Sequence, residues 1–259
     1  MYLLNNITNY LITIGDPRVK DWILFNPWLI IFIIFSYLYF IFVCGPRFMK
    51  NRKPYSLKTF IRCYDIFQIV INYYIVHKLL SAGWFTTIPL HCIPMKYGTD
   101  PDSIKLLHSC WWGFLTKLID LIETGIFVLR KKDQQISFLH LYHHISTVLV
   151  SWLFGKNYSD GMSTFIPLIN CSVHVIMYTY YFLSTFGPNV RKIIHRYKFL
   201  LTIIQMVQFI ILICFISQIF LPSCDVDNFP AAIMILNLFI NFFLFYNFYK
   251  KNYLAKKTR

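Results

Sequence analysis

The chain has little charge, and acidic residues are especially few. Only 14% of its 259 residues are charged, and 11 Asp and Glu stand against 25 Lys and Arg. Hydrophobic residues make up 57% of the chain and aromatic residues 19%. A soluble domain of this length cannot cover so much apolar surface, so the composition excludes an ordinary soluble protein and indicates a membrane protein.

Several common motifs are also absent. The sequence has no Gly-rich phosphate loop, no CxxC pair, no internal repeat and no low-complexity linker. Its first residues do not show the pattern of a signal peptide, which has a positively charged region, then a short apolar region, then a cleavage site of small residues. We therefore expect one domain over residues 1–259 with no cysteine-bound metal. Residues 1–27 are expected to form a short exposed tail before the first span.

Seven segments are long and apolar enough to cross a bilayer, which takes about 20 residues. They are 28–44, 60–81, 111–129, 137–155, 164–186, 199–221 and 230–249. The first is expected to face lipid and to stop at Gly45-Pro46-Arg47. The second and third are less clear because they carry polar residues.

The basic residues are placed unevenly. Eighteen of the 25 Lys and Arg fall within 47–62, 130–132, 191–198 and the tail 250–259. With seven spans these places share one side, which the positive-inside rule makes cytosolic, with the C-terminus there and the N-terminus across the membrane. The net charge of +14 is thus explained by topology and attraction to anionic lipid, and no nucleic-acid partner is expected.

Two cysteines, Cys92 and Cys224, fall in predicted loops on the non-cytosolic side. If that side is an oxidising lumen, a disulfide between them is chemically allowed, the alternative being two free thiols. Asn6-Ile7-Thr8 is a glycosylation sequon on the same side.

Three of the eight histidines lie within five residues. His140, His143 and His144 are spaced i, i+3 and i+4, so on a helix they share one face. Imidazoles in a segment buried in lipid are costly unless they are paired or functional. His174, in the next predicted span, adds a fourth.

Polar residues also occur in the neighbouring predicted spans. Those predicted to share the level of the histidines are Asp65, Gln68, Glu123, Thr124, Tyr178, Tyr181, Thr202 and Gln205. Those expected to bind substrate are Lys117, Asp120, Glu123, Thr124, Asn170, Tyr178, Tyr181, Gln205 and Gln208. Lys117 and Asp120 can neutralise one another at i, i+3. Because polar side chains in spans face the bundle interior, we expect a chamber open to the cytosol that continues as an apolar cleft. Such a cleft suits a substrate with a polar head and a hydrocarbon tail.

The histidines allow several interpretations. Imidazoles can bind metal, but membrane di-iron enzymes use several His-rich boxes and this chain has one. They can attack a thioester and move protons, or hydrogen-bond between helices as structural groups. Cys171, one turn before His174, suggests a Cys–His dyad or a small buried hydrophobe. A di-iron lipid oxidoreductase and a noncatalytic lipid transporter remain alternatives.

These residues occur in longer blocks that resemble the fatty acid elongase (ELO) family. The blocks are Lys117 to Lys132, Gln135 to His144, Asn170 to Tyr181 and Thr202 to Phe209, with Asp16-Pro17-Arg18 and Gly45 to Pro54 nearer the start. Glu123 stands where the family usually has aspartate, and Cys171 and Ser172 also differ. Lys256 and Lys257 are similar to the dilysine retrieval signal of endoplasmic-reticulum membrane proteins.

The resemblance implies a multi-pass enzyme of the endoplasmic-reticulum membrane with seven transmembrane helices, six of them forming a barrel-like bundle around a substrate tunnel. It implies the condensing step of elongation, in which acyl-CoA and malonyl-CoA give 3-oxoacyl-CoA, CO2 and CoA, without a metal or other cofactor. The CoA head would lie near Arg130, Lys131, Lys132 and Arg196. His143 or His174 would take the acyl group, and His140 and His144 would move protons. The reductase and dehydratase of the elongation cycle are expected partners, and a homodimer is a further candidate.

Overall fold

The structure is a computed structural model that describes residues 15–93, 96–224, 226 and 228–254. All regular elements in these residues are helical, which confirms the predicted all-α class. The α-helices are α2 (Pro27–Tyr39), α3 (Gly45–Met49), α4 (Lys58–Ser81), α5 (Pro101–Leu129), α6 (Phe138–Asn157), α7 (Phe165–Ser184), α8 (Pro188–His195), α9 (Lys198–Ile216) and α10 (Asn228–Tyr249). Short 3-10 or π turns extend several of them.

Four helical segments in the described residues are long and apolar enough to cross a membrane. They are Pro27–Met49, Gly161–Ser184, Lys198–Phe220 and Asn228–Leu254. The predicted spans 60–81, 111–129 and 137–155 correspond to α4, α5 and α6. These three helices carry the charged and polar side chains of the site, which lowers their hydropathy.

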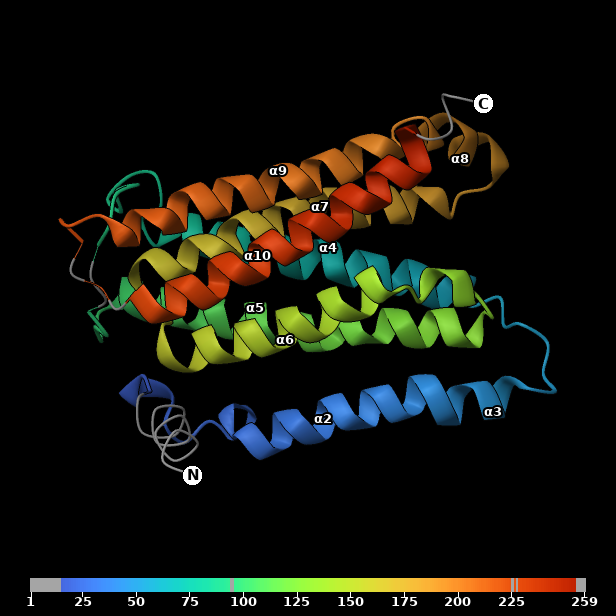
Figure 1. The fold of residues 1–259 in the computed structure, drawn as a ribbon, viewed down its shortest axis with the longest axis horizontal. Helices are drawn as coiled ribbons and strands as arrows, with labels where there is room; N and C mark the ends of the chain where they lie inside the picture. The colour runs from blue at the N-terminus through green and yellow to red at the C-terminus, as the bar shows by residue number, and fades with distance from the viewer. Residues whose placement is uncertain (1–14, 94–95, 225, 227, 255–259) are drawn as a thin grey trace.

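The helices pack in a closed circuit. α4 contacts α5 and α7, α7 contacts α9, α9 contacts α10, α10 contacts α6, and α6 contacts α5. α2 runs beside this group at its edge, as Figure 1 shows. The long helices run in alternating directions along the long axis of the molecule, so their connections gather at two opposite ends (Figure 1).

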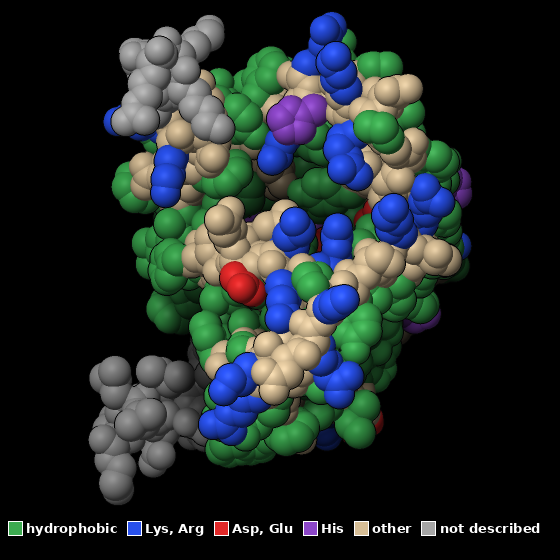
Figure 2. All heavy atoms as spheres, turned by 90° about the vertical axis from the view of Figure 1, so that its right-hand side faces the viewer, with side chains coloured by type: hydrophobic (Ala, Val, Ile, Leu, Met, Phe, Trp, Pro, Cys, Tyr) green, Lys and Arg blue, Asp and Glu red, His purple; other side chains and the backbone are tan. Residues whose placement is uncertain are grey.

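We call these two ends the basic end and the disulfide end. The basic end holds the α3–α4 connection, the α5–α6 connection and α8, and Figure 2 shows Lys and Arg side chains spread across it. The disulfide end holds the α4–α5, α6–α7 and α9–α10 connections.

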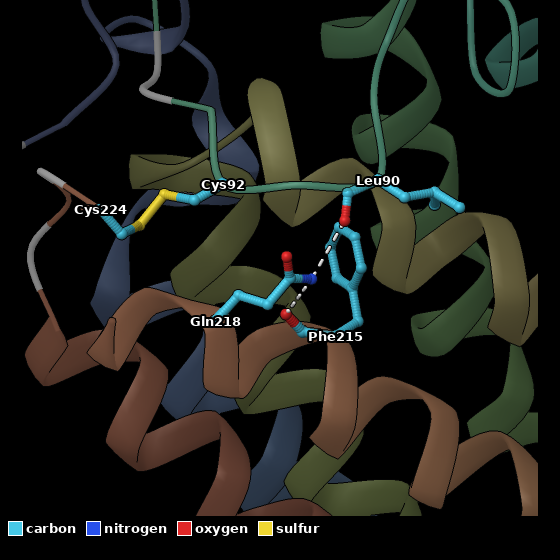
Figure 3. The surroundings of a disulfide bond; sticks show 5 residues. All are labelled: Leu90, Cys92, Phe215, Gln218 and Cys224. Carbon is cyan, nitrogen blue, oxygen red and sulfur yellow. Dashed lines mark hydrogen bonds between the residues drawn. A yellow bond between two sulfur atoms is a disulfide. The ribbon is translucent and has the colours of Figure 1, made fainter. Parts of the chain in front are cut away.

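A disulfide between Cys92 and Cys224 ties two connections at the disulfide end. The structure thus contains the pair expected from the sequence, with Cα atoms 5.7 Å apart. Nearby, Gln218 Nε2 donates to the carbonyl oxygens of Leu90 and Phe215, each at 3.1 Å (Figure 3). The loop after α4 is therefore fixed to the α9–α10 connection by a covalent bond and a hydrogen bond.

The expectation of an exposed tail up to residue 27 is wrong for its described part. Val19 and Phe25 are buried, and Phe25 stacks on Phe114 of α5 with ring centroids 5.6 Å apart. Asp16 pairs with Arg18, whose guanidinium also donates to the Gly98 carbonyl at 2.8 Å. The segment packs because its apolar side chains reach the surface of α5.

The predicted helix stop at Gly45-Pro46 is also wrong. α2 continues through a π turn, Phe40–Cys44, into α3. Pro46 lies in the first turn of α3, where its missing N–H is tolerated. Gly45 permits a close approach to α5, since a Cβ there would lie 2.5 Å from Val128 Cγ1 and 3.0 Å from the Phe40 carbonyl oxygen.

We predict that Gly45→Ala destabilises the protein by about 1–3 kcal/mol, because neither β-branched Val128 nor the backbone can readily move aside. Gly125→Ala is the matched control, since its Cβ would meet only Phe40 Cε1 at 3.9 Å. That change should leave stability equal or higher by up to about 1 kcal/mol, as alanine favours helix. Thermal unfolding of the purified protein in detergent measures both, and equal effects would contradict the close approach.

Candidate active site

The site is built outward from one face of α5. Lys117, Asp120 and Thr124 are spaced three and four residues apart, so they project to the same side, and all three are buried. Lys117 Nζ donates to Asp120 Oδ2 at 3.1 Å, which confirms the predicted pair. Two opposite charges are thus neutralised inside the bundle.

Asp120 also binds the two helices beside α5. Its Oδ1 accepts from Gln68 Nε2 of α4 at 2.7 Å and from the Tyr178 hydroxyl of α7 at 2.9 Å. The same Tyr178 hydroxyl lies 2.6 Å from Glu123 Oε1. The Tyr178 hydroxyl therefore contacts both Asp120 and Glu123 of α5. The Asp120 carboxylate in turn links α5 to α4 and α7.

His174 lies next to the ion pair. Its ring nitrogens Nδ1 and Nε2 are each 3.4 Å from Lys117 Nζ, and Nδ1 is 4.0 Å from Asp120 Oδ2. The imidazole is buried and packs beside the Tyr178 ring at 5.7 Å. A cation and a carboxylate thus both reach this histidine.

The three histidines of α6 have different partners. Ser137 caps α6 through the His140 N–H, which starts the helix just before them. His140 Nε2 is 2.8 Å from Thr124 Oγ1, and His144 Nε2 is 3.7 Å from Glu123 Oε2. The rings of His140 and His144 lie 4.2 Å apart. These two imidazoles face α5.

His143 points instead toward α10, where its Nδ1 is 3.1 Å from Asn241 Oδ1. Asn241 Nδ2 donates to the carbonyl and side-chain oxygens of Asn237 at 2.9 and 3.2 Å. This orients the Asn241 oxygen toward His143, so the hydrogen-bond network assigns the hydrogen to Nδ1 and makes Nε2 the acceptor nitrogen of the neutral ring. His143 is thus held by α10, whereas His140 and His144 contact α5.

Sequence reasoning missed Asn241, Asn237 and Tyr37 as site residues. Two asparagines at i, i+4 in an apolar span were the available signal for α10. Tyr37 lies in the span expected to face only lipid, yet it is buried and its hydroxyl is 2.8 Å from Thr124 Oγ1. Its phenol looks like an ordinary apolar ring in the sequence, so only the packing of α2 on α5 shows its role.

A cavity begins at Lys117 and His143 and continues toward the disulfide end. It comprises about 830 Å³ of space between atoms, part of it open to the surroundings. Its walls are mainly apolar side chains of α5, α6, α7, α9 and α10, with Asn170, Cys171 and Asn241 among the lining residues. Lys117 and His143 lie at one end of the cavity, and the rest is lined mainly by apolar side chains, with the hydroxyls of Ser151 and Ser163 among them.

The other predicted site residues lie at varied positions. Gln205 Nε2 contacts Met177 Sδ at 3.4 Å, and Gln208 is buried with an Oε1 that has no partner among the described residues. Tyr181 is 38% exposed, with its ring 6.1 Å from that of Tyr178. Arg130, Lys131 and Lys132 follow α5 at the basic end. Lys256, Lys257 and Asn6 lie outside the described residues.

A metal site would need at least three His, Cys, Asp or Glu side chains grouped around one point. Within residues 15–93, 96–224, 226 and 228–254, no three His, Cys, Asp or Glu side chains are grouped as a metal site requires. The imidazoles instead contact hydroxyl, amide, ammonium and carboxylate groups of neighbouring helices.

Long apolar helices around a buried histidine and carboxylate site define a multi-pass helical membrane protein with an internal chamber. The profile of the ELO family, described as the GNS1/SUR4 family, matches residues 22–259. Mouse very long chain fatty acid elongase 1 is 38% identical over 257 residues, covering 97% of this chain and 91% of that protein. The human protein of that name is 39% identical (94% and 88% covered), and rat very long chain fatty acid elongase 7 is 36% identical (92% and 86%). The chain belongs to the ELO family.

We predict that Lys117→Met destabilises the protein by about 3–5 kcal/mol, because it leaves the buried Asp120 carboxylate without its cation. The double variant Lys117→Met/Asp120→Asn removes both charges and should recover most of that loss. Thermal or denaturant unfolding in detergent measures the two. A double variant less stable than the single one would contradict this account of the pair.

Proposed function

We propose that this protein is a 3-oxoacyl-CoA synthase that performs the condensing step of fatty acid elongation. Long-chain acyl-CoA and malonyl-CoA would give 3-oxoacyl-CoA, CO2 and CoA. Membership of the ELO family and relatives named very long chain fatty acid elongases support this activity. The observation that carries it here is His143, whose hydrogen bond to Asn241 orients an imidazole at the head of an apolar cavity.

The first half-reaction would be acyl transfer to His143. Nε2 attacks the thioester carbonyl, a carbon–nitrogen bond forms, and the carbon–sulfur bond breaks with release of the CoA thiolate. The thiolate takes the proton that the imidazole loses. His140 and His144 would serve as proton-transfer groups of the site, and the ring of His144 lies 5.8 Å from that of His143.

The second half-reaction would form the new carbon–carbon bond. Malonyl-CoA loses CO2, and the resulting enolate carbon attacks the acyl carbon as the bond to Nε2 breaks. The leaving imidazole takes up one proton, which comes from the solvent and returns His143 to its neutral form. Developing negative charge on the two carbonyl oxygens needs nearby donors. Lys117, beside His174, lines the cavity, and so does Asn170. No cofactor takes part in this scheme.

The membrane arrangement that fits this function has seven spans. The first span would be the continuous segment formed by α2 and α3. Each of the other six spans would be one helix, namely α4, α5, α6, α7, α9 and α10, and these six would form a barrel-like bundle around the tunnel. The basic end would face the cytosol, where CoA and its phosphates could approach Arg130 and Arg196, and the disulfide end would face the lumen of the endoplasmic reticulum. The reductase and dehydratase of the cycle would then receive the product.

We predict that the purified protein releases CO2 from labelled malonyl-CoA only when an acyl-CoA is present. His143→Ala should lower that release by roughly 100-fold or more, because the nucleophile is lost. His77→Ala, at an exposed position of α4, is the matched control and should retain activity.

Intact mass after incubation with acyl-CoA alone locates the acyl group. The wild-type protein should gain the acyl mass and His143→Ala should not; a stable adduct on the variant would exclude His143 as the acceptor. Absence of malonyl-dependent CO2 release, with stoichiometric iron in the protein, would favour the di-iron oxidoreductase. The same absence without iron would favour a lipid transporter.

A further inference from the structure

A second cavity adjoins the first at the disulfide end. It comprises about 450 Å³ of space between atoms, and its walls are almost wholly apolar. Four residues line both cavities, namely Phe154, Tyr158, Ser163 and Ile166. We propose that Phe154 and Tyr158 form a partition that limits the length of the acyl chain by closing off the second cavity. This inference rests on the proposed function.

The length of the first cavity can be measured along α6. From His143 the lining residues Thr147, Ser151, Phe154 and Tyr158 follow one another along the helix. With a rise of about 1.5 Å per residue, Tyr158 lies roughly 22 Å from His143 along the axis. An extended hydrocarbon advances about 1.25 Å per carbon, the projection of a bond of about 1.5 Å. Phe154 lies roughly 16 Å from His143 by the same measure. An acyl chain held at His143 therefore reaches the level of Phe154 with about 13 carbons and that of Tyr158 with about 18.

The partition is held where α6 ends. The rings of Phe154 and Tyr158 lie one turn apart with centroids 5.4 Å from each other. The Tyr158 N–H donates to the Phe154 carbonyl at 2.7 Å, and the Tyr158 carbonyl accepts from Ser163 Oγ across the α6–α7 turn. Tyr158 is buried. Two aromatic rings in contact with one another thus border both cavities.

The far wall of the second cavity is fixed as well. Its lining residues Ile93 and Val226 lie one and two residues from Cys92 and Cys224, which form the disulfide of Figure 3. Ile219 and Ala231, near the α9–α10 connection, complete the apolar wall. The space behind the partition is therefore a defined chamber that a longer chain can occupy.

The test compares chain-length profiles. Wild-type protein, Phe154→Ala and the control Leu149→Ala, whose side chain is exposed on the same helix, are assayed with labelled malonyl-CoA and acyl-CoAs of 14 to 24 carbons. We expect Phe154→Ala to raise the ratio of 22-carbon to 16-carbon turnover by about tenfold, the effect of burying two more methylene groups. Leu149→Ala should keep the wild-type profile.

A second change tests whether the gain comes from the second cavity. Adding Ile219→Trp to Phe154→Ala fills the chamber and should return the profile to that of the wild type. Ile219→Trp alone should change the profile little. If Phe154→Ala does not fold, Phe154→Leu replaces it with the same expected direction.

Two outcomes separate this inference from the proposed function. Thermal stabilisation of the protein by 16-carbon and 22-carbon acyl-CoA measures chain accommodation without turnover. Failure of the wild type to elongate any acyl-CoA would overturn the proposed function. A folded Phe154 variant whose profile and stabilisation match the wild type would overturn the partition.

Discussion

The ion pair between Lys117 and Asp120 is the interaction on which the rest of the site depends. Burying two charges is costly unless the pair is close and its remaining hydrogen-bonding capacity is used. Asp120 meets that condition by binding Lys117, Gln68 and Tyr178, which belong to α5, α4 and α7. The same bonds that neutralise the charge therefore fix three helices. Once these are fixed, Glu123 faces His144 and Lys117 faces His174.

The molecule separates polar chemistry from chain binding along its long axis. His143 and Lys117 line the head of the first cavity, and mainly apolar side chains line the remainder. The basic end collects Lys and Arg (Figure 2), while the opposite end is held by the Cys92–Cys224 disulfide. An amphipathic substrate fits this division, since its charged head, reactive thioester and hydrocarbon tail would each meet a matching environment.

Much of the helical layout was predictable from hydropathy, because spans in a bilayer must be long and apolar. The predicted segments overlap the observed helices, but their ends differ where local structure decides. α5 begins at Pro101, ten residues before the predicted span, because Asp100 caps it. The helix after residue 27 passes Pro46 because the preceding π turn accommodates it, and the first described residues pack because Val19 and Phe25 reach α5. Such effects depend on contacts with a neighbouring helix, and the hydropathy of a single segment carries no information about those contacts.

The sequence by itself determined the helical class, the clustering of His140, His143 and His144, and the Lys117–Asp120 pair, since each follows from composition or from spacing within one helix. Only the tertiary structure decided which partner each histidine has. It gave Asn241 to His143, Thr124 to His140 and Glu123 to His144, because side chains one turn apart on a helix can face different neighbours. It also brought Phe154 and Tyr158 between two cavities. Contacts between helices depend on how the helices pack, and periodicity within one segment carries no information about that.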